Sequence, residues 1–243
     1  MAPSLLEIAE SSVAFVVPPH PSVVEGDGYL AFPRGPGLLA VQRIRLAPDR
    51  VDSTRAEIHE VARQRSAERI EWYVSELSEP ADLATRLGLG RHETLAALAL
   101  TSAPEASGAF DIREVRTLDD YITAQKLDSA VNDWPIADDE EYARAWETAR
   151  ERFLVWLALD DGRAVGMARC AVSEHALMMV GGAVLPDARG RGVYRALVEA
   201  RWASAAARGI PALVTAANDQ SAPILRRLGF AELGEIGVYA ESV

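Results

Sequence analysis

The stretch Val184-Leu185-Pro186-Asp187-Ala188-Arg189-Gly190-Arg191-Gly192-Val193-Tyr194-Arg195 places glycines and arginines between an apolar run and an Ala- and Leu-rich run. The apolar run, residues 176–185, predicts a strand buried on both faces, and residues 193–208, which contain neither Gly nor Pro, predict a helix. The first amides of such a helix have no partner within the helix and carry the positive end of its dipole. Because the glycines let backbone amides approach an anion closely, the stretch is expected to bind a phosphorylated ligand.

A second stretch, Asn218 to Phe230, follows the strand-like residues 212–216 and ends in Leu-Gly-Phe. Together the two stretches resemble the GNAT family of N-acetyltransferases. That family has an R/Q-x-x-G-x-G/A motif between its fourth strand and the next helix, and a later N-x-x-A-x-x-L-Y-x-x-L-G-F pattern. Arg189, Gly192 and Asn218 fit these motifs. The resemblance covers roughly residues 110–243.

The resemblance implies that acetyl-CoA is bound as a co-substrate by the end of the fourth strand, the glycine loop and the start of the last helix. The residues that it assigns to CoA are Gly182, Ala183, Val184, Arg189, Gly190, Arg191, Gly192, Val193, Tyr194, Arg195, Asn218 and Ser221. Two positions depart from the family pattern. Tyr194 stands where the loop motif has a small residue, and Leu225 stands where the family has the tyrosine that protonates the departing thiolate.

The chain is expected to consist of two halves. Residues 101–109 are small, polar and interrupted by Pro and Gly, which predicts a linker between residues 1–105 and 110–243. In the first half, the sequence predicts a helix over 55–70, a strand over 70–74 and a helix over 80–89. Leu87-Gly88-Leu89 then aligns with Leu228-Gly229-Phe230 at an offset of 228 − 87 = 141 residues.

This repeat predicts two tandem GNAT-like halves, each an α/β unit with a mixed, mostly antiparallel sheet flanked by helices. The first half has no glycine between Ile44 and Thr54, where a phosphate loop would lie, so we expect a degenerate copy. Its expected role is to complete a sheet or to form a wall of the acceptor pocket. The alternative is a chance similarity between two αβ segments.

Candidate catalytic residues are less well defined. Glu174 and His175 precede the fourth strand and are either general bases or solvated polar residues of a turn. Tyr194 and Tyr239 are candidates for the missing proton donor, and a packed aromatic residue at the helix start is the alternative for Tyr194. The acidic run 138–141 either caps a helix or faces a cationic acceptor. Cys170 is expected to be a small buried hydrophobic residue.

Composition limits the remaining possibilities. The chain has 243 residues, a formal net charge of −11 and one cysteine, so we expect no internal disulfide and no nucleic acid or anionic membrane as the main partner. Its histidines show no metal-ligand spacing, which predicts no metal. No apolar run reaches the roughly 18 residues of a membrane span, and the N-terminus does not resemble a signal peptide, so a cytoplasmic monomer or homodimer is expected.

The function expected from these observations is transfer of an acetyl group from acetyl-CoA to a primary amine of a small molecule or protein, by direct attack of the amine. Because Leu225 replaces the family's tyrosine, the alternative is a non-catalytic module that binds CoA or acyl-CoA as a sensor or scaffold. A third possibility is an αβ domain that binds another nucleotide.

Overall fold

The computed structural model describes residues 2–35, 37–105 and 110–243, and these residues form one continuous sheet of 11 strands. The strand order is β1-β2-β3-β4-β11-β5-β10-β9-β8-β7-β6. The predicted mixed and mostly antiparallel sheet is confirmed, since only β3 with β4 and β9 with β10 pair in parallel. Part of the predicted linker, residues 106–109, lies outside the described residues.

The described residues of the first half form three α-helices and five strands. In chain order they are α1 (Leu5–Glu10), β1 (Val24–Gly26), β2 (Tyr29–Gly35), β3 (Leu38–Gln42), α2 (Val51–Gln64), β4 (Arg69–Ser75), α3 (Leu83–Leu87) and β5 (Arg91–Leu100). The predicted helix over 55–70 therefore begins and ends earlier. Ser66 adopts a left-handed conformation two residues after α2, and this turns the chain into β4. The predicted helix over 80–89 is shorter, because Gly88, also left-handed, caps α3.

The second half contains the remaining elements. They are β6 (Asp111–Glu114), α4 (Leu118–Asn132), α5 (Asp139–Arg152), β7 (Phe153–Asp160), β8 (Arg163–Val172), β9 (Leu177–Val184), α6 (Val193–Ala207), β10 (Leu213–Ala217), α7 (Ala222–Arg227) and β11 (Ala231–Ser242). Asp138 caps α5, its Oδ1 accepting a hydrogen bond from the Glu141 amide at 2.8 Å. The acidic run 138–141 therefore caps a helix, which is the first of the two roles considered for it.

The predicted repeat is present in the order of the elements. The series β3-α2-β4-α3-β5 recurs as β9-α6-β10-α7-β11. Leu95 of β5 lies directly opposite Ile236 of β11, and 236 − 95 = 141, the offset found in the sequence. Equivalent residues of the two halves therefore meet at the centre of this strand pair.

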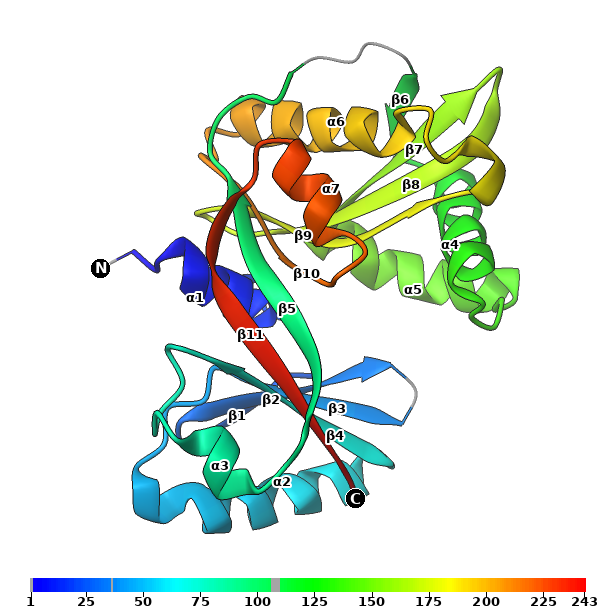
Figure 1. The fold of residues 1–243 in the computed structure, drawn as a ribbon. Coiled ribbons are helices and arrows are strands. Elements are labelled where there is room, and N and C mark those ends of the chain that lie inside the picture. The colour runs from blue at the N-terminus through cyan, green and yellow to red at the C-terminus, as the bar shows by residue number, and fades with distance from the viewer. Residues whose placement is uncertain (1, 36, 106–109) are drawn as a thin grey trace.

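The two halves exchange their last strands. β5, from the first half, lies between β10 and β11 of the second half, and β11 lies between β4 and β5. Figure 1 shows these two long strands running side by side from one half to the other. Residues 1–105 and 110–243 therefore do not form separate sheets, because each half supplies a strand that satisfies the backbone hydrogen bonds of the other.

A carboxylate at the end of β11 ties the exchanged strand to the first half. Glu241 accepts hydrogen bonds from the Trp72 indole at 2.8 Å and from the Arg55 guanidinium, and its Oε2 lies 3.3 Å from His59 Nε2. Burial acts to raise the pKa of Glu241, but the hydrogen bonds from Arg55, Trp72 and His59 outweigh it and hold the pKa below its usual value. The end of the chain is thus fixed in the core of the first half.

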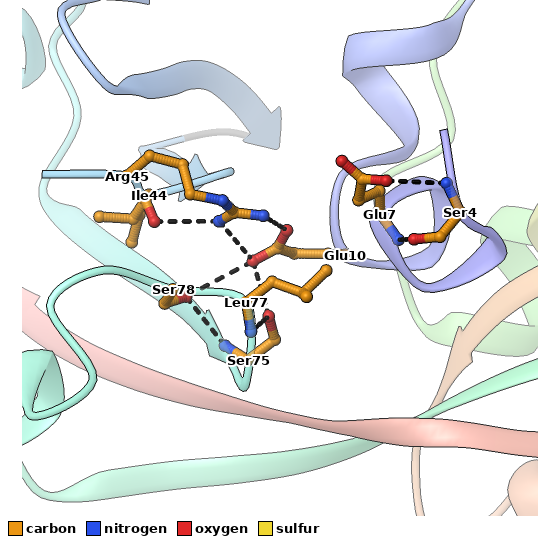
Figure 2. Close-up of polar contacts among 8 residues, drawn as sticks. All are labelled: Ser4, Glu7, Glu10, Ile44, Arg45, Ser75, Leu77 and Ser78. Carbon is orange, nitrogen blue, oxygen red and sulfur yellow. Dashed lines mark hydrogen bonds and ion pairs between the residues drawn. The ribbon is translucent and has the colours of Figure 1, made fainter. Parts of the chain in front are cut away.

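Helix α1 covers the junction between the halves. Its Leu6, Ile8 and Ala9 pack in one apolar cluster with residues of β5, β10 and β11. Glu10, at the end of α1, is fully buried and accepts hydrogen bonds from Arg45 Nη2 at 2.7 Å and from Ser75 Oγ at 2.7 Å (Figure 2). These contacts fix α1 to β4 and to the segment that follows β3.

We expect Glu10→Ala to lower the free energy of unfolding by about 3 kcal/mol, because it leaves the partly buried Arg45 without its counter-ion. Glu7 is a matched control in the same helix, since its carboxylate completes only an exposed capping box with Ser4 (Figure 2). Glu7→Ala should cost about 1 kcal/mol or less. Urea unfolding of both variants measures the difference, and equal losses would contradict a special role of Glu10.

Candidate functional site

The parallel strands β9 and β10 separate soon after they begin to pair. Leu213 pairs with Leu177 and Val214 with Met178, and no further pair follows. At Thr215 the strands are linked only through the side chain, whose hydroxyl donates to the Met179 carbonyl at 3.0 Å. The facing edges of β9 and β10 beyond these residues are therefore free to contact a ligand.

A β-bulge lies where the strands begin to separate. On the other edge of β9, Cys170 of β8 pairs with Met179 and Arg169 with Gly181, so that Val180 is the extra residue. The sequence predicted a strand buried on both faces, but only Leu177–Met179 is continuously buried, and Val180 is 40% exposed. The strand after the bulge borders an opening in the sheet.

A cavity of about 720 Å³ passes through this opening. On the side of α6 and α7 it is lined by Tyr194, Arg201, Asn218, Ser221 and Leu225. On the other side it reaches α1 and the first half, where Phe32, Gln42, Tyr73, Glu93 and Leu95 line it. The opening between β9 and β10 therefore connects two chemically different compartments.

The glycine loop lies at the surface beside the compartment formed by α6 and α7. Gly190 and Gly192 have φ angles of +73° and +93°, and a Cβ added to either would meet nothing within 4 Å. Gly192 precedes α6, and no side chain caps the helix. The first amides of α6 thus have no side-chain partner at the helix start.

The three arginines around this loop are held differently. Arg189 donates through Nε to the Val184 carbonyl at 3.2 Å, and Arg191 forms an ion pair with Asp160 at 2.8 Å. The nearest carboxylate to Arg195 is Glu105, at 4.0 Å. All three side chains lie on the surface of this part of the molecule, where they add positive charge.

The predicted CoA contacts fall into two groups. Gly182, Tyr194, Asn218 and Ser221 line the cavity. Ala183 and Val184 do not: Ala183 is buried against the helix α4 cluster, and Val184 packs against the core. Val193 is also a core residue, so only its backbone amide faces the loop. The part of β9 that lines the cavity therefore runs from Met178 to Gly182 and overlaps the segment that the sequence indicated only at Gly182.

Tyr194 turns its ring toward the opening in the sheet. A Cβ on Gly182 would lie 3.3 Å from the Tyr194 ring, so the glycine makes room for it. Leu225 is 1% exposed and lines the cavity from α7, where a tyrosine would present its hydroxyl. Asn218 accepts hydrogen bonds from the Ser221 amide at 3.1 Å and from its hydroxyl at 2.9 Å, which fixes the start of α7.

Three of the four predicted catalytic residues lie away from the cavity. Glu174 and His175 form the turn between β8 and β9, where the His175 amide donates to Ser173 Oγ. Tyr239 was expected near the site on a returning final strand. However, β11 crosses into the first half. The Tyr239 hydroxyl therefore accepts a hydrogen bond from Arg91 Nε at 3.2 Å, and the Tyr239 ring packs in the core of the first half. Tyr194 alone lines the cavity.

The structure brings to the cavity a carboxylate that the sequence analysis did not select. Glu93 lies at the start of β5 and forms no ion pair within the described part of the chain. His20 also lines this compartment, and burial, together with the charge of Arg152, lowers its pKa and so favours the neutral imidazole. An isolated acid before the apolar run 95–100 was the available signal, but the position of Glu93 in the cavity depends on the strand exchange.

Cys170 is fully buried, and burial raises the pKa of its thiol to about 12, which makes it inert as a nucleophile. Among the described residues, no group of three or more His, Cys, Asp or Glu could hold a metal ion. The helices of the described ranges are all too short or too polar to cross a membrane.

Residues 117–230 match the sequence model of the "Acetyltransferase (GNAT) family". These residues include the bulge, the glycine loop and the cavity-lining part of α7. This part of the chain is a GNAT-family domain. Members of this family use acetyl-CoA. No sequence among curated proteins matches the chain.

Solved GNAT structures share the whole fold. A GCN5-related N-acetyltransferase from Kribbella flavida superposes with a TM-score of 0.69 at 14% identity, covering 90% of this chain and 88% of its own. A tandem GNAT protein from the clavulanic acid biosynthesis pathway has a TM-score of 0.65 at 15% identity and covers 98% of this chain and 93% of its own. At such identities these likenesses show the fold alone, including the tandem arrangement.

Proposed function

We propose that this GNAT protein transfers an acetyl group from acetyl-CoA to a primary amine on a small molecule. The observation that carries the proposal is the cavity that crosses the sheet between β9 and β10. One of its compartments adjoins an uncapped helix start behind two glycines, and the other is lined by residues of α1 and of the first half. The phosphates of CoA and the acceptor would thus approach the same opening from opposite sides.

The glycine loop and α6 fit the pyrophosphate of CoA. The open backbone at Gly190 and Gly192 allows close approach, and Arg189 and Arg195 supply positive charge at the surface. The pantetheine arm would run along the free edge of β9 and reach the amide of Asn218. The thioester carbonyl would then lie at the bulge, where a main-chain N–H can stabilise the oxyanion of the tetrahedral intermediate.

The second compartment favours a small amine over a protein terminus. Part of its wall is α1, which is fixed by the buried Glu10. A pocket of several hundred cubic ångströms that must also admit the end of the pantetheine arm fits a small molecule. The chain's net charge of −11 attracts a cationic acceptor.

We assign the general base to Glu93. Its carboxylate lines the acceptor compartment and has no ion-pair partner among the described residues, so it is available to accept a proton. The neutral amine nitrogen forms a bond to the thioester carbon, and the proton that the nitrogen then loses passes to Glu93. The C–S bond breaks with its electron pair going to sulfur, and the thiolate takes up a proton on release. The products are the acetamide and CoA.

A second candidate function rests on Leu225. With a leucine at the position of the family's tyrosine, the protein would be a sensor or scaffold that binds CoA or acyl-CoA without turnover. Release of free thiol from acetyl-CoA in the presence of an amine panel distinguishes the two. Turnover with any amine supports the transferase, binding without turnover supports the sensor, and no binding of CoA contradicts both.

Gly192→Ala is expected to weaken CoA binding at least tenfold, because an alanine resists the left-handed conformation and disturbs the amides that face the pyrophosphate. Gly162 is a matched control: its φ is +81°, its surroundings are equally open, and it lies in the exposed turn between β7 and β8. Both variants should lose similar stability. Calorimetry with CoA should show weaker binding for Gly192→Ala only. Equal affinities of the two variants would contradict binding of the pyrophosphate by the glycine loop.

Glu93→Gln is expected to reduce kcat for the best amine by about 10²-fold or more, because the variant cannot accept a proton. Its affinity for CoA should not change, since Glu93 lies on the acceptor side of the opening. Glu25→Gln, which alters an exposed glutamate of the edge strand β1, is the control and should keep full activity. An unchanged kcat in Glu93→Gln would show that Glu93 is not the general base.

A further inference from the structure

Arg201 is a fully buried arginine on α6. Its exposed fraction is 0%, which places it among the largest fully buried side chains of the described chain. Nε donates to the Leu197 carbonyl at 3.1 Å, and Nη1 lies 3.5 Å from the Gly181 carbonyl. The third nitrogen, Nη2, is buried and has no hydrogen-bond partner in the described residues. The interior thus contains a guanidinium in which one nitrogen has no hydrogen-bond partner among the described residues.

No carboxylate neutralises this charge. Within the described residues Arg201 makes no ion pair, and Glu199, two residues away on the same helix, projects from a different face. The groups that face it are the Tyr194 ring, whose centroid is 5.5 Å from the guanidinium, and the Cys170 thiol of β8. Because burial raises the pKa of Cys170 to about 12, that thiol is neutral and does not supply a negative charge.

Burying an unpaired charge costs several kcal/mol, so an unpaired buried arginine indicates an anion that is absent from the protein itself. Arg201 lines the cavity together with Tyr194 and Leu225, on the α6 side of the opening. Its Nη1 contacts the carbonyl of Gly181, the residue directly after the bulge. An anion formed at the bulge would therefore lie beside the guanidinium.

We propose that Arg201 stabilises the thiolate of CoA as it leaves the acetyl group, in place of the absent tyrosine at Leu225. The proposal rests on the acetyl-transfer function above. When the C–S bond breaks, sulfur keeps the electron pair and becomes a thiolate. Arg201 stays protonated and pairs with it, and sulfur takes a proton from solvent on release. No proton donor is then required at position 225.

A bound thiolate paired with Arg201 has a lower thiol pKa than free CoA, whose alkyl thiol, like that of cysteine, ionises only above about pH 8. Lowering the pKa in the bound state makes CoA bind more tightly as the pH rises toward the free thiol's pKa. Desulfo-CoA, which carries hydrogen in place of the thiol, cannot show this effect. The ratio of the two dissociation constants therefore isolates the sulfur from every other titrating group.

The test is calorimetry with CoA and with desulfo-CoA between pH 6.5 and about 9.5. In the wild-type protein the affinity for CoA relative to desulfo-CoA should rise about tenfold or more across this range. Arg201→Gln should abolish the rise while still binding desulfo-CoA, and Arg201→Lys, which keeps the charge, should restore part of it. Arg208→Gln removes an exposed arginine at the end of the same helix and should leave the ratio unchanged.

A pH-independent ratio in the wild-type protein would overturn the role of Arg201, and that measurement needs no variant to fold. The role of Arg201 would also be overturned if Arg201→Gln weakened the binding of both ligands equally and the affinity for CoA relative to desulfo-CoA still rose with pH. Failure of both ligands to bind the wild-type protein would instead contradict the proposed function. The two failures are therefore distinguishable.

Discussion

The hydrogen bonding of β5 and β11 is the constraint on which the rest of the structure depends. Each strand follows the last helix of its own half but finds both of its neighbours in the other half. β5 is apolar from Leu95 to Leu100 and is buried, as a strand in the middle of a sheet must be. The exchange thus places both strands in the interior of one continuous sheet, where each has a neighbour on either side.

This exchange explains why a half without a phosphate loop is retained. In the first half α2 continues directly from the turn at residues 48–50, so no glycine loop opens its N-terminus. The half instead supplies β5 next to β10, a surface on which α1 is fixed, and the wall of the second compartment. One site is thus built from two copies of the fold, of which only one retains the features for binding phosphates.

Local patterns predicted most of this fold. The strand at 177–184, the loop with two left-handed glycines, the helix from Val193 and the repeat at an offset of 141 residues all follow from short-range periodicity and glycine placement. The exchange did not follow, because β5 and β11 have the same apolar pattern whichever half they pair with. For that reason Tyr239 was placed at the site and Glu93 was not. Arg201 was missed because, in a helix rich in arginine, nothing local distinguishes a buried arginine from an exposed one.

The central claim is that a single acyl-transfer site is formed by both halves. It is tested most directly by a crystal structure of the protein with a bisubstrate ligand, in which CoA is joined through an acetyl linker to an amine that the protein accepts or binds. The account predicts the pyrophosphate at Gly190–Gly192, the sulfur between the Val180 bulge and Arg201, and the amine portion in contact with Glu93 and Tyr73. An amine portion that leaves the opening toward solvent, without contacting any residue of the first half, would contradict it.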